Sequence, residues 1–176
     1  TGIPLTLGIV LLEVGWRLGL CLEGVSFPGH FLVRFVGEEA RLLVDPFDGG
    51  RIRFEGDAQE LLDRVYGGMV RLRPSFLRAA GKQEILVRLL TNLKGIFLNV
   101  HDHDRALAAV ERILLIHPTA TGEIRDRGTL LAKLDRAEEA IQQLEWYLGY
   151  APEAPDVDRI RTLVATLRGT EDDRDS

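Results

Sequence analysis

The chain has 176 residues, of which 45% are hydrophobic and 28% are charged, and its formal net charge is −5. This composition is globular and excludes a disordered chain, and the length allows one ordinary domain or two small ones. An acidic chain with scattered cations predicts neither a nucleic-acid partner nor an anionic membrane partner. The single cysteine excludes an internal disulfide framework and favours a reducing compartment, so we expect a cytoplasmic protein.

The beginning of the sequence has no initiator Met and no secretory signal. Apolar residues start almost at once, and we expect upstream sequence to be missing. Residues 2–18 predict a helix that is apolar on nearly every side, with Pro4 in its first turn. A helix of this kind lies at the centre of its domain. The apolar run 5–12 is far shorter than the roughly 20 residues of a membrane span.

The hydrophobic pattern then changes to that of short strands. The predicted strands are residues 20–25, 31–36, 41–44 and 51–54, and Asp48-Gly49-Gly50 is a hairpin signal before the last strand. Asp57 and Glu60 have the spacing of a capping box that opens the next helix. A further short helix is expected over residues 74–80. The first part of the chain is therefore predicted to be α+β with a small antiparallel sheet.

The second part of the chain is predicted to be all helix, and it repeats. Ala106 and Ala140 are 34 residues apart, and so are Pro118 and Pro152. This is the period of tetratricopeptide (TPR) repeats, in which a small residue lets the two helices of a hairpin approach closely. Gly128 matches a position where such repeats have a small residue, whereas its counterpart, Lys94, departs from the pattern.

We expect two TPR hairpins and a closing helix over residues 82–168, followed by a charged, disordered tail over 169–176. Such hairpins usually present a concave face to a peptide or protein. Two hairpins make only a short groove, so a purely structural role, in which they pack on the first domain, is the alternative.

Two motifs in the first part carry chemistry. His30 follows Pro28-Gly29 and opens one predicted strand, and Asp45 closes the next strand. On adjacent antiparallel strands the two side chains would lie side by side. The carboxylate would then orient the imidazole, as in the second half of a Cys–His–Asp relay.

The motifs Gly-Ile-Pro, Pro-Gly-His-Phe-Leu and Asp-Pro-Phe-Asp-Gly-Gly occur in this order and precede the repeats. Together they resemble the bacterial SirB-type transglutaminase-like/TPR family, whose core shares its fold with papain-like cysteine enzymes. The resemblance covers residues 2–168. It implies an α+β transglutaminase-like core over residues 1–81, lacking upstream helices, then all-α TPR hairpins over 82–168. It also implies a regulatory role in bacteria.

The resemblance also assigns the positions of a catalytic triad. In the superfamily, a Gly-x-Cys motif opens a buried helix and supplies the nucleophile. This motif falls on Gly2-Ile3-Pro4, while the His and the Asp fall on His30 and Asp45. Pro4 has no thiol, hydroxyl or N–H, so it can neither attack a carbonyl nor donate to an oxyanion. The implied triad therefore lacks its nucleophile.

Two other residues are candidate nucleophiles. Cys21 lies beyond the predicted helix, roughly 25 Å from its N-terminus at 1.5 Å per residue, and we interpret it as a small buried hydrophobe. Thr6 is nearer, but a Thr in a helix usually bonds a backbone carbonyl. Without a nucleophile, His30 and Asp45 form either an inter-strand hydrogen bond or a polar pocket for a partner's side chain.

The segment His101-Asp102-His103-Asp104 has the composition of a metal site. Two His at i, i+2 lack a helical ligand spacing, and no third distant ligand is evident. We interpret this segment as a solvated turn between two helices. The sequence predicts no metal, no cofactor and no small-molecule ligand.

The sequence therefore predicts a non-catalytic, regulatory pseudoenzyme whose TPR face holds another protein or peptide. We expect the repeats to lean on the core, so that the binding surface combines the TPR face with the His30/Asp45 pocket. The alternative is a hydrolase or transferase in which His30 and Asp45 activate water or a nucleophile other than Cys.

Overall fold

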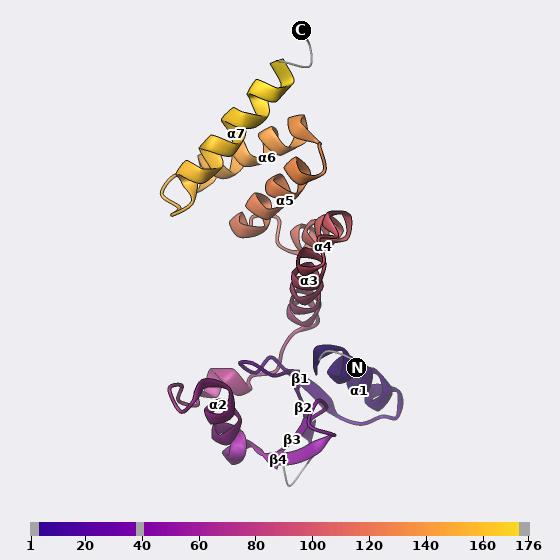
Figure 1. Cartoon of the computed structure of the whole chain (residues 1–176). Helices are drawn as coiled ribbons and strands as arrows, with labels where there is room; N and C mark the ends of the chain where they lie inside the picture. The colour runs from indigo at the N-terminus through magenta and orange to yellow at the C-terminus, as the bar shows by residue number, and fades with distance from the viewer. Residues whose placement is uncertain (1–3, 38–40, 173–176) are drawn as a thin grey trace. The chain divides into compact units, whose positions relative to one another are not determined.

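The computed structural model describes residues 4–37 and 41–172 (Figure 1). The chain divides into two compact units, residues 1–89 and 90–176, and the division falls inside helix α3 (Lys82–Asn99). The first unit contains, in order, α1 (Pro4–Arg17), β1 (Leu22–Val25), β2 (Leu32–Val36), β3 (Arg41–Asp45), β4 (Arg51–Phe54), the 3-10 helix η1 (Glu55–Asp57), α2 (Ala58–Tyr66) and the 3-10 helix η2 (Pro74–Leu77). The second contains α4 (His103–Ile116), α5 (Thr121–Lys133), α6 (Ala137–Tyr150) and α7 (Val157–Asp172).

The strands of the first unit form one antiparallel sheet in the order β1-β2-β3-β4. Each strand pairs with the next one along the chain, and Val33 of β2 lies opposite Val44 of β3. The predicted α+β architecture with a small antiparallel sheet is thus confirmed. The short connections and the glycines of the β3–β4 turn, Gly49 and Gly50 with φ of 63° and 76°, allow this simple order.

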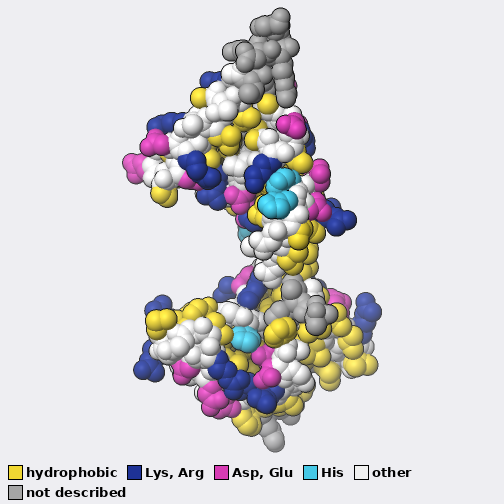
Figure 2. All heavy atoms as spheres, viewed as in Figure 1, with side chains coloured by type: hydrophobic (Ala, Val, Ile, Leu, Met, Phe, Trp, Pro, Cys, Tyr) yellow, Lys and Arg dark blue, Asp and Glu magenta, His cyan; other side chains and the backbone are white. Residues whose placement is uncertain are grey.

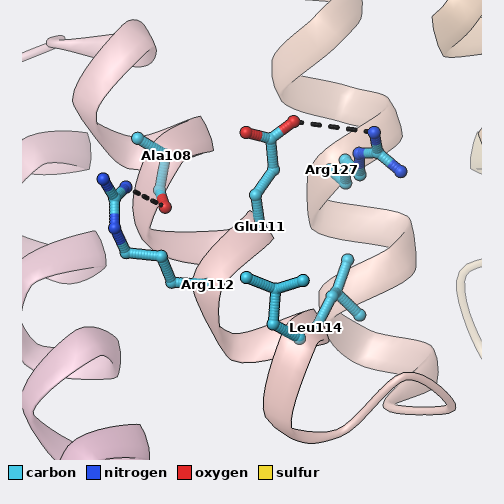
Figure 3. Close-up of a pocket in the computed structure, with 6 residues that line it drawn as sticks. Ala108, Glu111, Arg112, Leu114 and Arg127 are labelled. Carbon is cyan, nitrogen blue, oxygen red and sulfur yellow. Dashed lines mark hydrogen bonds and ion pairs between the residues drawn. The ribbon is translucent and has the colours of Figure 1, made fainter.

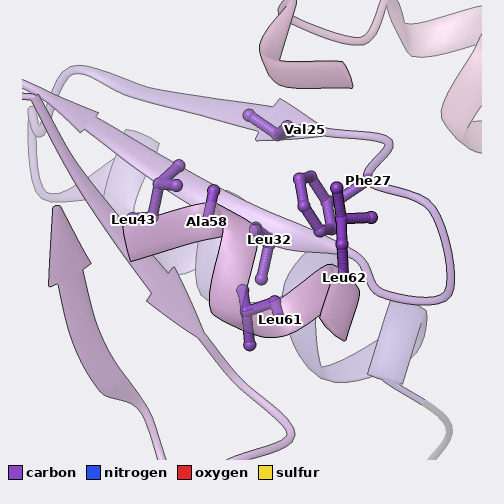
Figure 4. Close-up of a cluster of buried hydrophobic side chains, with 7 residues drawn as sticks. All are labelled: Val25, Phe27, Leu32, Leu43, Ala58, Leu61 and Leu62. Carbon is purple, nitrogen blue, oxygen red and sulfur yellow. The ribbon is translucent and has the colours of Figure 1, made fainter. Parts of the chain in front are cut away.

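Both faces of the sheet are covered, α2 lying on one side and α1 on the other (Figure 1). Successive residues of β2 alternate between the faces, so Leu32 packs toward α2 and Val33 toward α1. On the α2 side, Leu61 and Leu62 lie against Phe27 and Leu32 in a fully buried cluster (Figure 4). At about 25 cal/mol per Å² of buried apolar area, such clusters are the main source of stability.

The expectation that α1 is buried on every side is wrong for the described residues. Leu5 and Leu12 are buried against the sheet, but Val10 and Val14, on the outer face, are 59% and 49% exposed. Figure 2 shows apolar side chains gathered over α1 on the surface of this unit. The sheet and the first turns of α3 cover one side of the helix, and no other described element packs on the opposite side.

Two local predictions in this unit need correction. Asp57 precedes α2 but does not cap it, because its carboxylate accepts a hydrogen bond from Phe54 N at 3.2 Å within the preceding 3-10 turn. The expected helix over residues 74–80 is the 3-10 helix η2, which ends at Leu77. Helix α2 itself ends at Tyr66, and Gly67 terminates it with a φ of 60°.

The second unit is a stack of helical hairpins, which confirms the repeat prediction. Ala106 and Ala140, the repeated small residues, are completely buried. Gly128 is required by the packing of α5 on α6, because a Cβ there would lie 2.6 Å from Leu144 Cδ2. The larger repeated residues, Val110 and Leu144, fill the space beside the alanines.

The turns inside the two hairpins are also related by the repeat. His101 follows α3 and Asp135 follows α5, and each has a φ of 57° in the left-handed region. Their positions differ by 34 residues, the period of the hairpins. Non-glycine residues adopt this conformation only occasionally, and Asp and His are among those that do so most often.

The last helix, α7, ends at Asp172. Residues 169–172 are therefore helical, although the whole segment 169–176 was expected to be a disordered tail. Residues 173–176 lie outside the described residues. In the part of the chain that the structure describes, no helix has both the length and the apolar character needed to cross a membrane.

Candidate functional site

His30 and Asp45 come together at the edge of the sheet in the first unit. His30 lies two residues before β2 and Asp45 ends β3, so the antiparallel pairing of these strands brings the two residues close. His30 Nδ1 lies 3.3 Å from Asp45 Oδ2. The distance is within ion-pair range, but the two atoms do not meet hydrogen-bond geometry.

The Asp45 carboxylate is buried, with 1% of the side chain exposed. Its Oδ1 accepts hydrogen bonds from Phe47 N at 3.0 Å and Asp48 N at 3.3 Å, which fix the turn after β3. Its Oδ2 has no hydrogen-bond partner among the described residues and faces His30 Nδ1. A buried carboxylate oxygen favours a nearby donor, and Nδ1 is the His30 ring nitrogen that faces Oδ2.

The loop that carries His30 is held against α2. Gly29 has a φ of 75°, and a Cβ at this position would lie 2.9 Å from Val65 Cγ1. Both the backbone conformation and the space therefore require glycine. The His30 amide donates to Phe27 O at 3.1 Å, which closes the turn.

Arg88 of α3, which the sequence did not single out, fastens the same loop. Its Nη1 donates to Ser26 Oγ at 2.8 Å and to Phe27 O at 3.3 Å, and its Nη2 donates to His30 O at 2.9 Å. Burial lowers the pKa of this guanidinium from its usual value. The apolar pattern of α3 gives no signal for this role, because the contact depends on a tertiary approach.

The residues considered as nucleophiles lie on α1 or in the connection that follows it. Pro4 begins α1, while Gly2 and Ile3 of the same motif lie outside the described residues. Cys21 is exposed, which corrects its interpretation as a buried hydrophobe: it lies in the connection between α1 and β1, outside the strand. Thr6 is half-buried on α1. His30 Nδ1 has no hydrogen-bond partner among the described residues.

In the segment His101-Asp102-His103-Asp104, the first two residues lie in the turn between α3 and α4, whereas His103 and Asp104 already belong to α4, so the predicted turn is confirmed only for its first half. Asp102 is the N-cap of α4, and its Oδ1 accepts a hydrogen bond from Arg105 N at 3.1 Å. The capping role explains why an aspartate stands here. The described residues contain no group of three or more His, Cys, Asp or Glu side chains placed to hold a metal ion.

The second unit carries a groove made of three cavities in series. The first lies between α3 and α4 and has a volume of about 270 Å³. It shares Ala108 and Arg112 with a larger cavity of about 540 Å³ along α4 (Figure 3). That cavity in turn shares Leu114 and Arg127 with a third, of about 260 Å³, which reaches α6 at Trp146. We call this series the arginine groove.

An ion network beside the groove ties α3 and α5 to Asp156, the residue that precedes α7. Lys94 Nζ lies 2.8 Å from oxygens of both Glu123 and Asp126. Arg125 bridges Asp126 to Asp156, at 2.8 Å and 3.0 Å. Burial raises the pKa of Asp126, but hydrogen bonds from Lys94 and Arg125 outweigh it and hold this pKa below its usual value. Lys94, the departure from the repeat pattern, is thus explained by its partners.

Comparison with known protein families gives one match in each part of the chain. The family model of the transglutaminase-like superfamily matches residues 1–91, which is half of the chain. The chain belongs to the transglutaminase-like superfamily. A tetratricopeptide repeat model matches residues 93–165 of this transglutaminase-like protein. No solved structure gives a significant match.

The curated relatives of this transglutaminase-like protein are bacterial, and the expected SirB-type family is confirmed. A UPF0162 protein of Xylella fastidiosa is 40% identical over 172 residues, which cover 94% of this chain and 60% of the relative. A UPF0162 protein of Vibrio cholerae is 32% identical, covering 94% of the chain and 62% of the relative. Protein SirB1 of Salmonella typhimurium is 29% identical, with the same two coverages, 94% and 62%. The chain thus spans about three fifths of the length of these relatives.

Proposed function

We propose that this protein binds other polypeptides in a regulatory role in the bacterial cytoplasm and does not catalyse a reaction. The observation that carries the proposal is Pro4, which opens α1 where the superfamily places its cysteine nucleophile. Residues 82–168 are proposed as the binding region, because TPR hairpins generally hold peptides or proteins. His30 and Asp45 are proposed to be vestigial triad positions, held in place by the hairpin and by Arg88.

Labelling with thiol-reactive and hydroxyl-reactive electrophiles tests the non-catalytic proposal. Cys21 is exposed, so we expect a thiol reagent to label it to the same extent in the parent chain and in His30→Ala. In a Cys21→Ala background we expect no labelling that depends on His30. A label in that background that disappears with His30→Ala would reveal an active nucleophile and sink the proposal.

One observation favours catalysis as a second candidate. Asp45 is buried and directs Oδ2 at His30 Nδ1, an arrangement that suits a His general base. A hydrolase or transferase that activates water or a nucleophile other than Cys would use this pair. Turnover of an ester or amide substrate that is lost in both His30→Ala and Asp45→Asn would favour this candidate over the non-catalytic one.

A further inference from the structure

The lining of the arginine groove is basic, in contrast to the whole chain, whose net charge is −5. Arg105, Arg112 and Arg127 line its cavities, and Glu111 is the one acidic residue among the described lining residues. Arg112 donates to Ala108 O at 2.7 Å, and within the described residues no carboxylate lies within ion-pair distance of it. Arg105 is paired with Asp102 and Arg127 with Glu111, each at 3.5 Å, so the positive charge that the described residues do not neutralise lies at Arg112.

Arg127 occupies the junction between two of the cavities. Its guanidinium lies 3.5 Å from Glu111 Oε1, a long contact that Figure 3 shows, and 3.4 Å from Gln143 Oε1. Its buried Nε has no hydrogen-bond partner among the described residues. A carboxylate is the ligand that a planar guanidinium binds best, since two parallel N–H groups can donate to its two oxygens.

The two ends of the groove are apolar. At one end Leu90, Leu93 and Phe97 of α3 form the floor. At the other end Ile124 and Trp146 form it. Trp146 is 45% exposed and stacks on Tyr150, with ring centroids 5.0 Å apart. A rigid exposed aromatic pair of this kind is typical of an anchor site in a protein interface.

From this arrangement we propose that the arginine groove binds an extended acidic segment of another protein. Glutamate or aspartate side chains of the segment contact Arg112 and Arg127 at the centre of the groove. A bulky apolar side chain at each end of the segment lies against Phe97 or Trp146. This inference rests on the proposed binding function and goes beyond it by defining the chemistry of the partner.

A nucleic acid fits these observations less well than a protein segment. Guanidinium groups and a tryptophan also suit single-stranded RNA. However, three arginines in a chain of net charge −5 neutralise few phosphates, and nucleic-acid sites usually carry a larger basic surface. The apolar floors at both ends favour aliphatic side chains.

Selection from a random peptide library displayed on filamentous phage, with the full chain as bait, tests the proposal. We expect selected peptides to have Asp or Glu at the centre and Leu, Ile, Phe or Trp at the ends. Fluorescence polarisation then gives the affinity of a synthetic peptide with the selected consensus. Added salt should weaken this binding, because charged pairs at an open groove are screened.

Charge reversal at the exposed Arg112 provides the decisive comparison. We expect Arg112→Glu to weaken binding of the consensus peptide by about tenfold or more, and Arg127→Gln by roughly tenfold. Arg161→Glu, the same charge change on exposed α7 outside the groove, should leave the affinity within about twofold. Circular dichroism of each variant establishes that it is folded.

Several outcomes overturn the acidic-segment proposal. They are selection of peptides without acidic residues, no selection at all, equal binding by Arg112→Glu, or tighter binding of a single-stranded RNA that displaces the peptide. Self-association that Arg112→Glu abolishes would assign the groove to a second copy instead. None of these results bears on His30-dependent labelling, so failure here and failure of the proposed non-catalytic function are separate.

Discussion

Single side chains hold the candidate site in the first unit. Arg88 is half-buried and donates hydrogen bonds to one hydroxyl and two carbonyls of the loop that carries His30. Its guanidinium also lies over the Phe31 ring, 6.0 Å from the centroid. The imidazole therefore keeps its place beside Asp45 through the backbone of its own loop as well as through the carboxylate.

We predict that Arg88→Ala lowers the free energy of unfolding by about 2–3 kcal/mol, because three hydrogen bonds are lost, among them the one that Arg88 donates to His30 O. Urea denaturation measures this change. The His30 imidazole resonances should broaden or shift in a ¹H–¹⁵N spectrum, whereas those of His117, outside the first unit, should not. Unchanged His30 resonances would show that Arg88 does not position the site.

At Gly128 the absence of a side chain sets the distance between two helices. We predict that Gly128→Ala destabilises the protein by about 1–3 kcal/mol, because the new methyl group collides with Leu144. Gly149→Ala on α6 is the matched control, since its Cβ meets no atom within 4 Å. Alanine there should stabilise by up to about 1 kcal/mol. Thermal unfolding measures both variants. Changes of the melting temperature with the same sign in the two variants would contradict the packing argument.

The turns between the helices of each hairpin contain residues in a strained backbone conformation. His101 and Asp135 adopt the left-handed conformation at equivalent places in the two hairpins. This conformation costs a residue with a Cβ roughly 1–2 kcal/mol relative to glycine. Both hairpins contain this strained residue at the same place, so the strain arises from the geometry of the turn and not from the identity of the residue.

We therefore expect Asp135→Gly to raise the free energy of unfolding by up to about 1 kcal/mol, the relief of backbone strain being partly offset by the greater freedom of glycine when unfolded. Asp135→Val should be destabilising, since a β-branched residue tolerates this conformation least. Guanidinium denaturation of the two variants checks the order. Stabilisation by Val would refute the assignment of strain.

The ion network of the TPR unit predicts a pH dependence. The pKa of Asp126 is lowered, because hydrogen bonds from Lys94 and Arg125 outweigh its burial, and that of Asp156 is lowered by hydrogen bonds from Tyr147 and Arg125. A carboxyl group with a lowered folded pKa stabilises the fold above its unfolded value of about 4. Stability should therefore decline as the pH falls below about 4, toward the lower folded pKa values.

Lys94→Met tests this network directly. Removing the ammonium leaves Glu123 and Asp126 without their shared partner, so we expect a loss of about 2 kcal/mol at neutral pH. The acid-induced loss should also become shallower, because the pKa of Asp126 moves back toward its ordinary value. Lys133→Met, which removes an exposed lysine of α5, should change neither quantity appreciably. Equal pH profiles for parent and Lys94→Met would contradict the argument.

At the scale of the whole molecule, the features that could be predicted from the sequence are those that depend on a local pattern of residues. Alternation of apolar residues predicts the strands, and the 34-residue spacing of Ala106 and Ala140 predicts the hairpins, because both patterns reflect burial along one element. The proximity of His30 and Asp45 follows from their places at the ends of neighbouring strands. These features need only the order of elements along the chain.

Features that depend on how elements approach one another could not be predicted. The outer face of α1 is apolar, but its exposure depends on which elements cover it. Cys21 is exposed and lies just before β1, which begins two residues later than the predicted strand over 20–25. Arg112 and Arg127 belong to different helices, and no sequence pattern shows that they line one groove.

The segment between Gly67 and Ala80 is attached to the sheet layer by a few side chains. Gln59 accepts from Leu72 N at 2.8 Å and donates to Val70 O at 3.0 Å, and Arg34 donates to Leu77 O at 2.7 Å. Apolar residues of this segment from Val70 onwards pack against the core, and Ala80 N donates to Gly24 O at 2.7 Å, so the exposed part is the one around Met69. Insertions or a fluorescent tag placed next to Met69, which is 85% exposed, should therefore be tolerated, so this loop offers a site for engineering a reporter into the protein.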